Sequence, residues 1–178
     1  MSETVTFSIE KHVARLTLNN PEKHNALGRK ELDALRSAVA EVAASDSVRV
    51  LVLSGEGDKT FCAGASLQEL NAGEIRGDDY QDMTDAIADL AIPTVCAISG
   101  NVFGGGVELA LSCDFRIGIE GTRMRVPAAS IGLCYPVRGI ERFVQRLGPG
   151  VAKRILVASE TLNADEMLRI GFLDHLVM

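Results

Sequence analysis

The sequence has no tryptophan, and aromatic residues make up only 4% of its 178 positions. Proteins that bind single-stranded nucleic acid by base stacking depend on such side chains. Basic residues are also in the minority, with 18 lysines and arginines against 24 aspartates and glutamates, which gives a net charge of −6. We therefore expect no nucleic-acid partner, and an anionic ligand would have to be held by local amides and a few cations.

The chain also lacks a run of about 18 apolar residues, so we expect no membrane span. Residues 1–4 show no positively charged region followed by an apolar one, as a signal peptide would have. The four cysteines show no CxxC spacing, and we interpret them as buried, reduced thiols rather than disulfides or metal ligands: Cys62, Cys96, Cys113 and Cys134. These features predict a soluble protein of the cytoplasm.

Several cofactor motifs are missing as well. The three histidines show no metal-ligand spacing. Residues 54–60 look superficially like a phosphate-binding P-loop, but Asp58 stands where that motif needs a glycine before Lys59. Gly100 and the glycines at 104–106 do not give the G-x-G-x-x-G of a dinucleotide site, and no G-x-S-x-G occurs. We expect no metal, ATP or dinucleotide cofactor.

What the sequence does have is a repeating order of strands and helices. Residues 5–9 and 14–18 alternate apolar and polar side chains, which predicts a β-hairpin. The nearly continuous apolar run at 48–53 is typical of a strand buried on both faces. We predict further strands at 94–99, 114–119 and 176–177, and helices at 29–44, 67–70, 80–90, 107–112, 139–147, 150–159 and 164–170. This order predicts an α/β fold, in which the polar stretch 71–79 is expected to be exposed and mobile.

Two glycine-rich turns, Phe61–Leu67 and Ser99–Leu109, each follow a strand and precede a helix. Small residues in such turns leave backbone N–H groups unobstructed, and the helix N-terminus adds partial positive charge. Two converging N–H groups would make an oxyanion hole for an enolate or a tetrahedral anion. Tight packing of helix on strand is the alternative, and spacing alone favours it.

Glu108 is the one charged residue in the first turn of an otherwise apolar helix. The helix N-terminus would stabilise its carboxylate, while the apolar neighbours would desolvate it, so the two effects on its pKa oppose each other. A capping role and acid–base chemistry are both open, and the nearby glycine turn favours the second.

Taken together, the motifs resemble the crotonase, or enoyl-CoA hydratase/isomerase, family. The resemblance extends over essentially the whole chain and is carried, in order, by the segments Asn20–Leu27, Phe61–Leu67, Pro93–Gly100, Gly104–Ala110, Cys113–Asp114, Leu162–Glu166 and Gly171–Asp174. It implies a crotonase-like spiral of repeated ββα units, an acyl-CoA thioester as ligand, and a homotrimer or hexamer. Coenzyme A would enter as part of the substrate, so no separate cofactor is implied.

The same resemblance assigns the site residues. It places the oxyanion hole at the N–H groups of Ala65 and Gly105, with Glu108 as the acid–base group. It also implies a wider set of residues that bind the substrate and its CoA portion: Lys23, His24, Ala26, Ala63, Ala65, Ser66, Leu67, Gln68 and Gly105.

Three departures from the family pattern bear on the reaction. Hydratases of the family carry a second glutamate where this chain has Ala128, which cannot transfer a proton. Tyr135 falls where a family decarboxylase that acts on methylmalonyl-CoA has an active-site tyrosine, although an aromatic plug beside Pro136 is the structural alternative. The C-terminal helical region of the family is missing after Met178, so we expect residues 1–178 to form a single crotonase-like core domain, whose unclosed apolar edge would favour association.

Three functions follow as hypotheses. The leading one is a hydratase or isomerase of fatty acid metabolism that uses Glu108 alone. The second is an acyl-CoA decarboxylase in which Tyr135 orients or protonates the enolate. The third is a catalytically weak acyl-CoA-binding scaffold, which Ala128 and the missing C-terminal region would favour.

Overall fold

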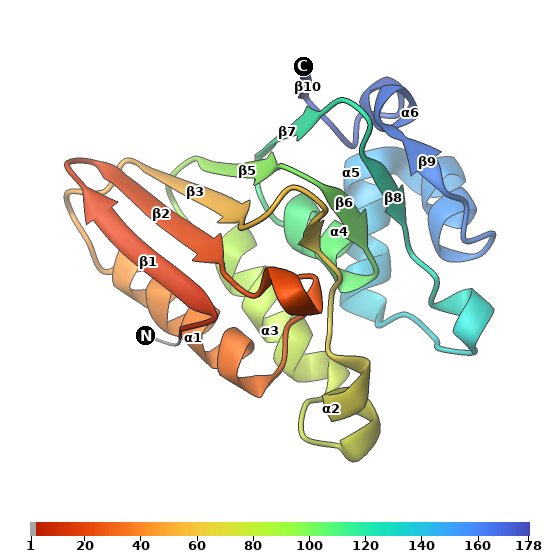
Figure 1. The fold of residues 1–178 in the computed structure, drawn as a ribbon, viewed down its shortest axis with the longest axis horizontal. Coiled ribbons are helices and arrows are strands. Elements are labelled where there is room, and N and C mark those ends of the chain that lie inside the picture. Colours follow the sequence, from red (N-terminus) through yellow and green to blue (C-terminus); the bar gives the residue numbers. More distant parts are fainter. Residues whose placement is uncertain (1–2) are drawn as a thin grey trace.

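The computed structural model describes residues 3–178 and arranges their strands in two sheets (Figure 1). The six-stranded sheet has the order β1-β2-β3-β5-β7-β10 and the four-stranded sheet the order β4-β6-β8-β9. The strands of the larger sheet are β1 (Val5–Glu10), β2 (Val13–Leu18), β3 (Val50–Gly55), β5 (Thr94–Ile98), β7 (Phe115–Ile119) and β10 (His175–Val177). Those of the smaller sheet are β4 (Thr60–Cys62), β6 (Asn101–Phe103), β8 (Arg123–Arg125) and β9 (Leu162–Asn163).

The helices follow the strands along the chain. They are α1 (Arg29–Ala43), α2 (Leu67–Ala72), α3 (Gly77–Ala88), α4 (Gly105–Leu111), α5 (Val137–Leu156) and α6 (Ala164–Arg169), with short 3₁₀ helices at Pro21–Lys23 and Ala129–Ile131. Helix α5 is kinked at Gly148, where φ is +79°, so the two helices expected on either side of this residue are joined across a bend. Asn163 caps α6 by accepting a hydrogen bond from the Glu166 amide.

The spiral arises because successive units give one strand to each sheet. β3 and β4, β5 and β6, and β7 and β8 are consecutive pairs whose first member lies in the large sheet and whose second lies in the small one. β1 and β2 form the predicted antiparallel hairpin, while β2, β3, β5, β7 and β10 run parallel. This is the predicted arrangement of repeated ββα units.

The core lies between the large sheet and the helices on one of its faces. Alternate residues of the strands, such as Leu51 and Leu53 of β3, point to this side and are fully buried. They pack in one cluster with the apolar stripe of α1, which includes Leu32, Leu35 and Val39. Figure 1 shows α1 and α3 side by side beneath the hairpin.

One expectation from the sequence was right in part and another was wrong. The stretch 71–79 is largely exposed, as expected, but it contains the end of α2 and the start of α3, Ile75 is buried, and Asp79 accepts hydrogen bonds from Arg29. Cys134 is exposed, contrary to the expectation that all four cysteines are buried; the other three are buried, and all four are free thiols.

No helix within residues 3–178 combines the length and the apolar character needed to cross a bilayer.

Candidate active site

Both glycine-rich turns leave the same edge of the small sheet. β4 and β6 are parallel neighbours, so the turns that follow them emerge side by side and lead into α2 and α4. The turns touch at Gly64, which has φ +86°, because a Cβ atom built there would lie 2.4 Å from the amide nitrogen of Gly105. Glycine at 64 is therefore required both by the backbone conformation and by the contact.

The parallel bridge between Leu27 and Ala65 decides the direction of the Ala65 amide. The Leu27 amide donates to the Gly64 carbonyl at 2.8 Å, and the Ser66 amide donates to the Leu27 carbonyl at 2.8 Å. The N–H of Ala65, between these two, points away from Leu27. It has no acceptor among residues 3–178, and neither has the N–H of Gly105, which begins α4.

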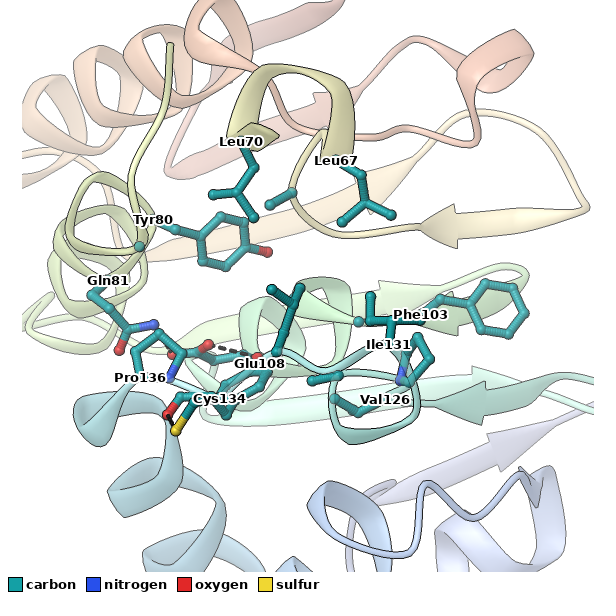
Figure 2. Close-up of a pocket in the computed structure, with 18 of the residues that line it drawn as sticks. Leu67, Leu70, Tyr80, Gln81, Phe103, Glu108, Val126, Ile131, Cys134 and Pro136 are labelled. Carbon is teal, nitrogen blue, oxygen red and sulfur yellow. Dashed lines mark hydrogen bonds between the residues drawn. The ribbon is translucent and has the colours of Figure 1, made fainter. Parts of the chain in front are cut away.

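Ala65 and Gly105 line one cavity of about 340 Å³ between the two turns, α3 and the segment before α5 (Figure 2). Its walls are mainly apolar, and the lining includes Ala63, Leu67, Leu70, Val126, Ala128, Ile131 and Leu133. The lining residues with polar side chains are few, namely Arg76, Tyr80, Gln81, Glu108, Cys134 and Tyr135. An apolar cleft with a few placed polar groups is the usual form of a small-molecule site.

Glu108 is 1% exposed and lies at the base of this cavity. Its Oε2 accepts a hydrogen bond from the Tyr135 hydroxyl at 2.8 Å, and its Oε1 accepts one from Gln81 Nε2 at 2.9 Å. Thr84 Oγ1 donates to the same Oε1 at 3.4 Å, and Arg142 Nε lies 3.8 Å away from it. All these partners are side chains, so the carboxylate does not cap α4 through backbone amides.

The surroundings of Glu108 shift its pKa in two directions. Burial raises it, while the hydrogen bonds from Tyr135 and Gln81 and the charge of Arg142 lower it. Burial prevails, and the pKa lies above its ordinary value. A carboxyl group whose pKa is raised in this way in a cleft is suited to proton transfer.

Tyr135 contacts the carboxylate from the segment before α5, and its ring packs edge to face on Phe143 at 5.6 Å between centroids. Burial and the negative charge of Glu108 hold its pKa well above the usual range, so the phenol stays protonated and donates. Tyr135 is therefore more than an aromatic plug beside Pro136, because its hydroxyl is hydrogen-bonded to the Glu108 carboxylate.

The other predicted residues lie around the cavity rather than in its wall. Ser66 caps α2 by accepting from the Glu69 amide, and Gln68 is exposed on that helix. Lys23 and Ala26 lie on the segment before Leu27. His24 contacts Thr60 Oγ1 at 2.9 Å and lines a second, more open hollow of about 530 Å³ with Lys59.

Sequence reasoning missed the residues that hold Glu108 from other helices. Gln81 and Thr84 are buried polar residues three positions apart on α3, and Arg142 comes from α5. The polar pair on the inner face of an amphipathic helix was a signal for a buried polar partner.

Cys62 has a structural role in the first glycine-rich turn. Its buried thiol, with a pKa raised to about 12, donates to the Asn25 carbonyl and accepts from the Gly64 amide.

Comparison with known proteins agrees with this geometry. The family model described as enoyl-CoA hydratase/isomerase matches residues 8–178, and the chain belongs to this family. It is 35% identical to a crotonyl-CoA hydratase of Syntrophomonas wolfei over 98% of this chain and 69% of the relative, and 31% identical to a short-chain-enoyl-CoA hydratase of Clostridium acetobutylicum over 94% and 66%.

Solved structures show the same fold. An enoyl-CoA hydratase from Bacillus anthracis superposes with a TM-score of 0.90 at 28% identity, over 98% of this chain and 70% of that one. DspI of Pseudomonas aeruginosa superposes with a TM-score of 0.91 at 32% identity, over 99% and 69%. The crotonase-like fold is confirmed, whereas the assignment of residues 1–178 to a single core domain stays a prediction.

Proposed function

We propose that this chain binds an acyl-CoA thioester and catalyses hydration or double-bond isomerisation through an enolate. In this mechanism the N–H groups of Ala65 and Gly105 hold the thioester oxygen, and Glu108 moves the proton. The observation that carries the proposal is that two amides without internal acceptors line the same apolar cavity as a buried carboxylate of raised pKa. Negative charge on the thioester oxygen would be stabilised by both amides in a site of low polarity.

The proton transfers can be written with Glu108 as the only acid–base group. For isomerisation of a β,γ-enoyl thioester, the carboxylate removes an α-proton, charge moves onto the thioester oxygen, and the carboxyl returns the proton to the γ-carbon. For hydration, it takes a proton from water as the oxygen adds to the β-carbon and passes that proton to the α-carbon. Isomerisation needs one proton-transfer group, which suits a chain with Ala128 in place of a second glutamate.

The surroundings of the cavity suggest where the CoA portion lies. Ala63, Ser66, Leu67 and Gln68 would border the thioester on the side of the first turn. Lys23, His24 and Ala26 lie on the segment that ends in the bridge between Leu27 and Ala65. We place the CoA portion of the substrate along the exposed surface of this segment.

Incubation with crotonyl-CoA in heavy water tests the proposal. Mass spectrometry of the recovered thioester separates gain of water from exchange of carbon-bound protons for deuterium. Either result supports enolate chemistry, and their ratio tells hydratase from isomerase. Absence of both, with no binding of crotonyl-CoA by calorimetry, would refute the proposed function. Binding without either reaction would favour the acyl-CoA-binding scaffold.

Decarboxylation is the second candidate, favoured by Ala128 in the cavity wall and by the Tyr135 hydroxyl at 2.8 Å from Glu108. Loss of carbon dioxide from methylmalonyl-CoA leaves the bonding electrons as the same enolate, and a proton on the α-carbon completes the product. Release of carbon dioxide from methylmalonyl-CoA, with no reaction of crotonyl-CoA, would establish this alternative.

Tyr135→Phe is expected to move the pH dependence of turnover. If ionised Glu108 is the base, kcat/KM falls as the pH drops through the pKa of this carboxyl. The Tyr135 hydrogen bond favours the ionised form, so its loss raises the pKa further and moves the acid limb to higher pH. A profile of kcat/KM against pH for both proteins measures the shift. An acid limb that stays in place or moves to lower pH would contradict it.

We also propose that the chain associates as a homotrimer or hexamer. Phe115 and Ile117 of β7 and Val177 of β10 are exposed, as are Val137 and Val144 of α5. Covering these apolar side chains would favour association. Light scattering is expected to give three or six times the 19.0 kDa chain mass, and a stable monomer at micromolar concentration would refute it.

A further inference from the structure

Tyr80 is a buried residue of the core whose hydroxyl has no use in the fold or in the mechanism above. It lies in the first turns of α3, is 5% exposed, and lines the cavity. Figure 2 shows its ring between Leu70 and Glu108 of α4, with the hydroxyl directed into the cavity. That hydroxyl has no hydrogen-bond partner among residues 3–178.

The phenol end of Tyr80 lies against Gly105. A Cβ atom built at Gly105 would come within 2.6 Å of Tyr80 Cζ and 2.7 Å of its hydroxyl oxygen. Any larger residue at 105 would displace the phenol. The hydroxyl therefore lies beside the residue whose free amide we propose as an oxyanion donor.

No group among residues 3–178 takes this hydrogen bond, although Gln81 Oε1, an acceptor on the same cavity, is also without a partner. The oxygens of Glu108 are engaged by Gln81, Thr84 and Tyr135. The cavity walls around the phenol are mostly hydrocarbon, including Leu67, Leu70 and Val126. Burial, helped by the negative charge of Glu108, raises the pKa of Tyr80 well above its usual range, so its hydroxyl keeps its proton and can donate. A buried donor without an acceptor costs free energy, which an acceptor on a ligand in the cavity would recover.

We propose that the Tyr80 hydroxyl donates a hydrogen bond to the thioester oxygen of the bound acyl-CoA, as a third donor beside the amides of Ala65 and Gly105. The proposal rests on the function proposed above. It makes Tyr80 a residue that stabilises the enolate, and it explains why a site-facing hydroxyl is left without an internal partner.

Tyr80→Phe tests this directly because it keeps the ring and removes only the hydroxyl. The readout is exchange of the α-protons of butyryl-CoA in heavy water, since this acyl group has the thioester oxygen as its only oxygen. We expect the exchange rate to fall about 10- to 100-fold, chiefly in kcat. The melting temperature of the ligand-free protein should stay the same or rise, because no internal hydrogen bond is lost.

The possible results separate the two proposals. Wild-type protein that neither binds nor reacts with crotonyl-CoA or butyryl-CoA refutes the proposed function and the role of Tyr80 with it. Active wild type with Tyr80→Phe exchange within twofold refutes only the role of Tyr80. A third outcome is that Tyr80→Phe slows turnover of 3-hydroxybutyryl-CoA but leaves the exchange of butyryl-CoA intact. The Tyr80 hydroxyl would then contact the substituent on the acyl chain, which would also refute its role at the thioester oxygen.

A second measurement needs no change at Tyr80. The chain has two tyrosines, so labelling them with carbon-13 at Cζ gives two signals, which Tyr135→Phe assigns. We expect acetyl-CoA to shift the Tyr80 signal and free CoA, which has no acyl oxygen, to leave it in place. Equal shifts with both ligands, or none with saturating acetyl-CoA, would refute the hydrogen bond.

Discussion

Glu108→Gln is expected to lower hydration or isomerisation by roughly two to four orders of magnitude, the usual contribution of a positioned acid–base group. Glutamine has nearly the size of glutamate and can still accept from Gln81 or Tyr135, but it has no carboxyl proton to exchange. Turnover of crotonyl-CoA and binding of the same thioester by calorimetry would be measured side by side. We expect the affinity to change little, because the thioester oxygen is held by backbone amides.

Thermal stability is the control for this substitution. Removing a buried carboxylate relieves its desolvation, whereas Arg142 keeps its ion pair with Asp85. The melting temperature should therefore stay within a few degrees of wild type, which corresponds to about 1 kcal/mol. Unchanged turnover in Glu108→Gln would refute the proposed mechanism even with the fold and the ligand class intact. Decarboxylation needs no base, so a protein of that type would be damaged more by Tyr135→Phe.

The long elements of this fold could be predicted from the sequence, and the strands of the small sheet could not. The hairpin of β1 and β2 and helix α1 show clear periods of 2 and 3.6 residues over six or more positions. Every strand of the small sheet has only two or three residues, too few to show a period. Yet the parallel pairing of β4 and β6 is what brings the two glycine turns together.

The site divides in the same way. Glu108, Ala65 and Gly105 lie on the turns and the helix start that carry the glycine motifs, so motif spacing could identify them. Gln81, Thr84 and Arg142 reach Glu108 from α3 and α5, which no local pattern connects to it. The same holds for the free hydroxyl of Tyr80, because a missing partner is visible only in three dimensions.

The structure also decides how the oxyanion donors can be tested. Proline at 105 would remove the amide proton, but its Cβ atom would collide with Tyr80. Gly64→Ala is the better substitution, since the new methyl group meets the Gly105 amide at 2.4 Å and forces the two turns apart. Gly171 offers a matched control, because its φ of +78° is similar and a Cβ atom there meets nothing within 4 Å.

Gly64→Ala is expected to lower kcat/KM for the acyl-CoA substrate by roughly 100-fold, which is about 3 kcal/mol for one displaced donor. Gly171→Ala, like Gly64→Ala, places an alanine at positive φ, which costs about 1–2 kcal/mol. It should therefore lose stability but keep full activity per folded molecule. Turnover and melting temperature of both variants separate strain from displacement. If Gly64→Ala lost only stability, as Gly171→Ala should, the contact between the turns would serve packing alone, and the amides of Ala65 and Gly105 would not form the oxyanion hole.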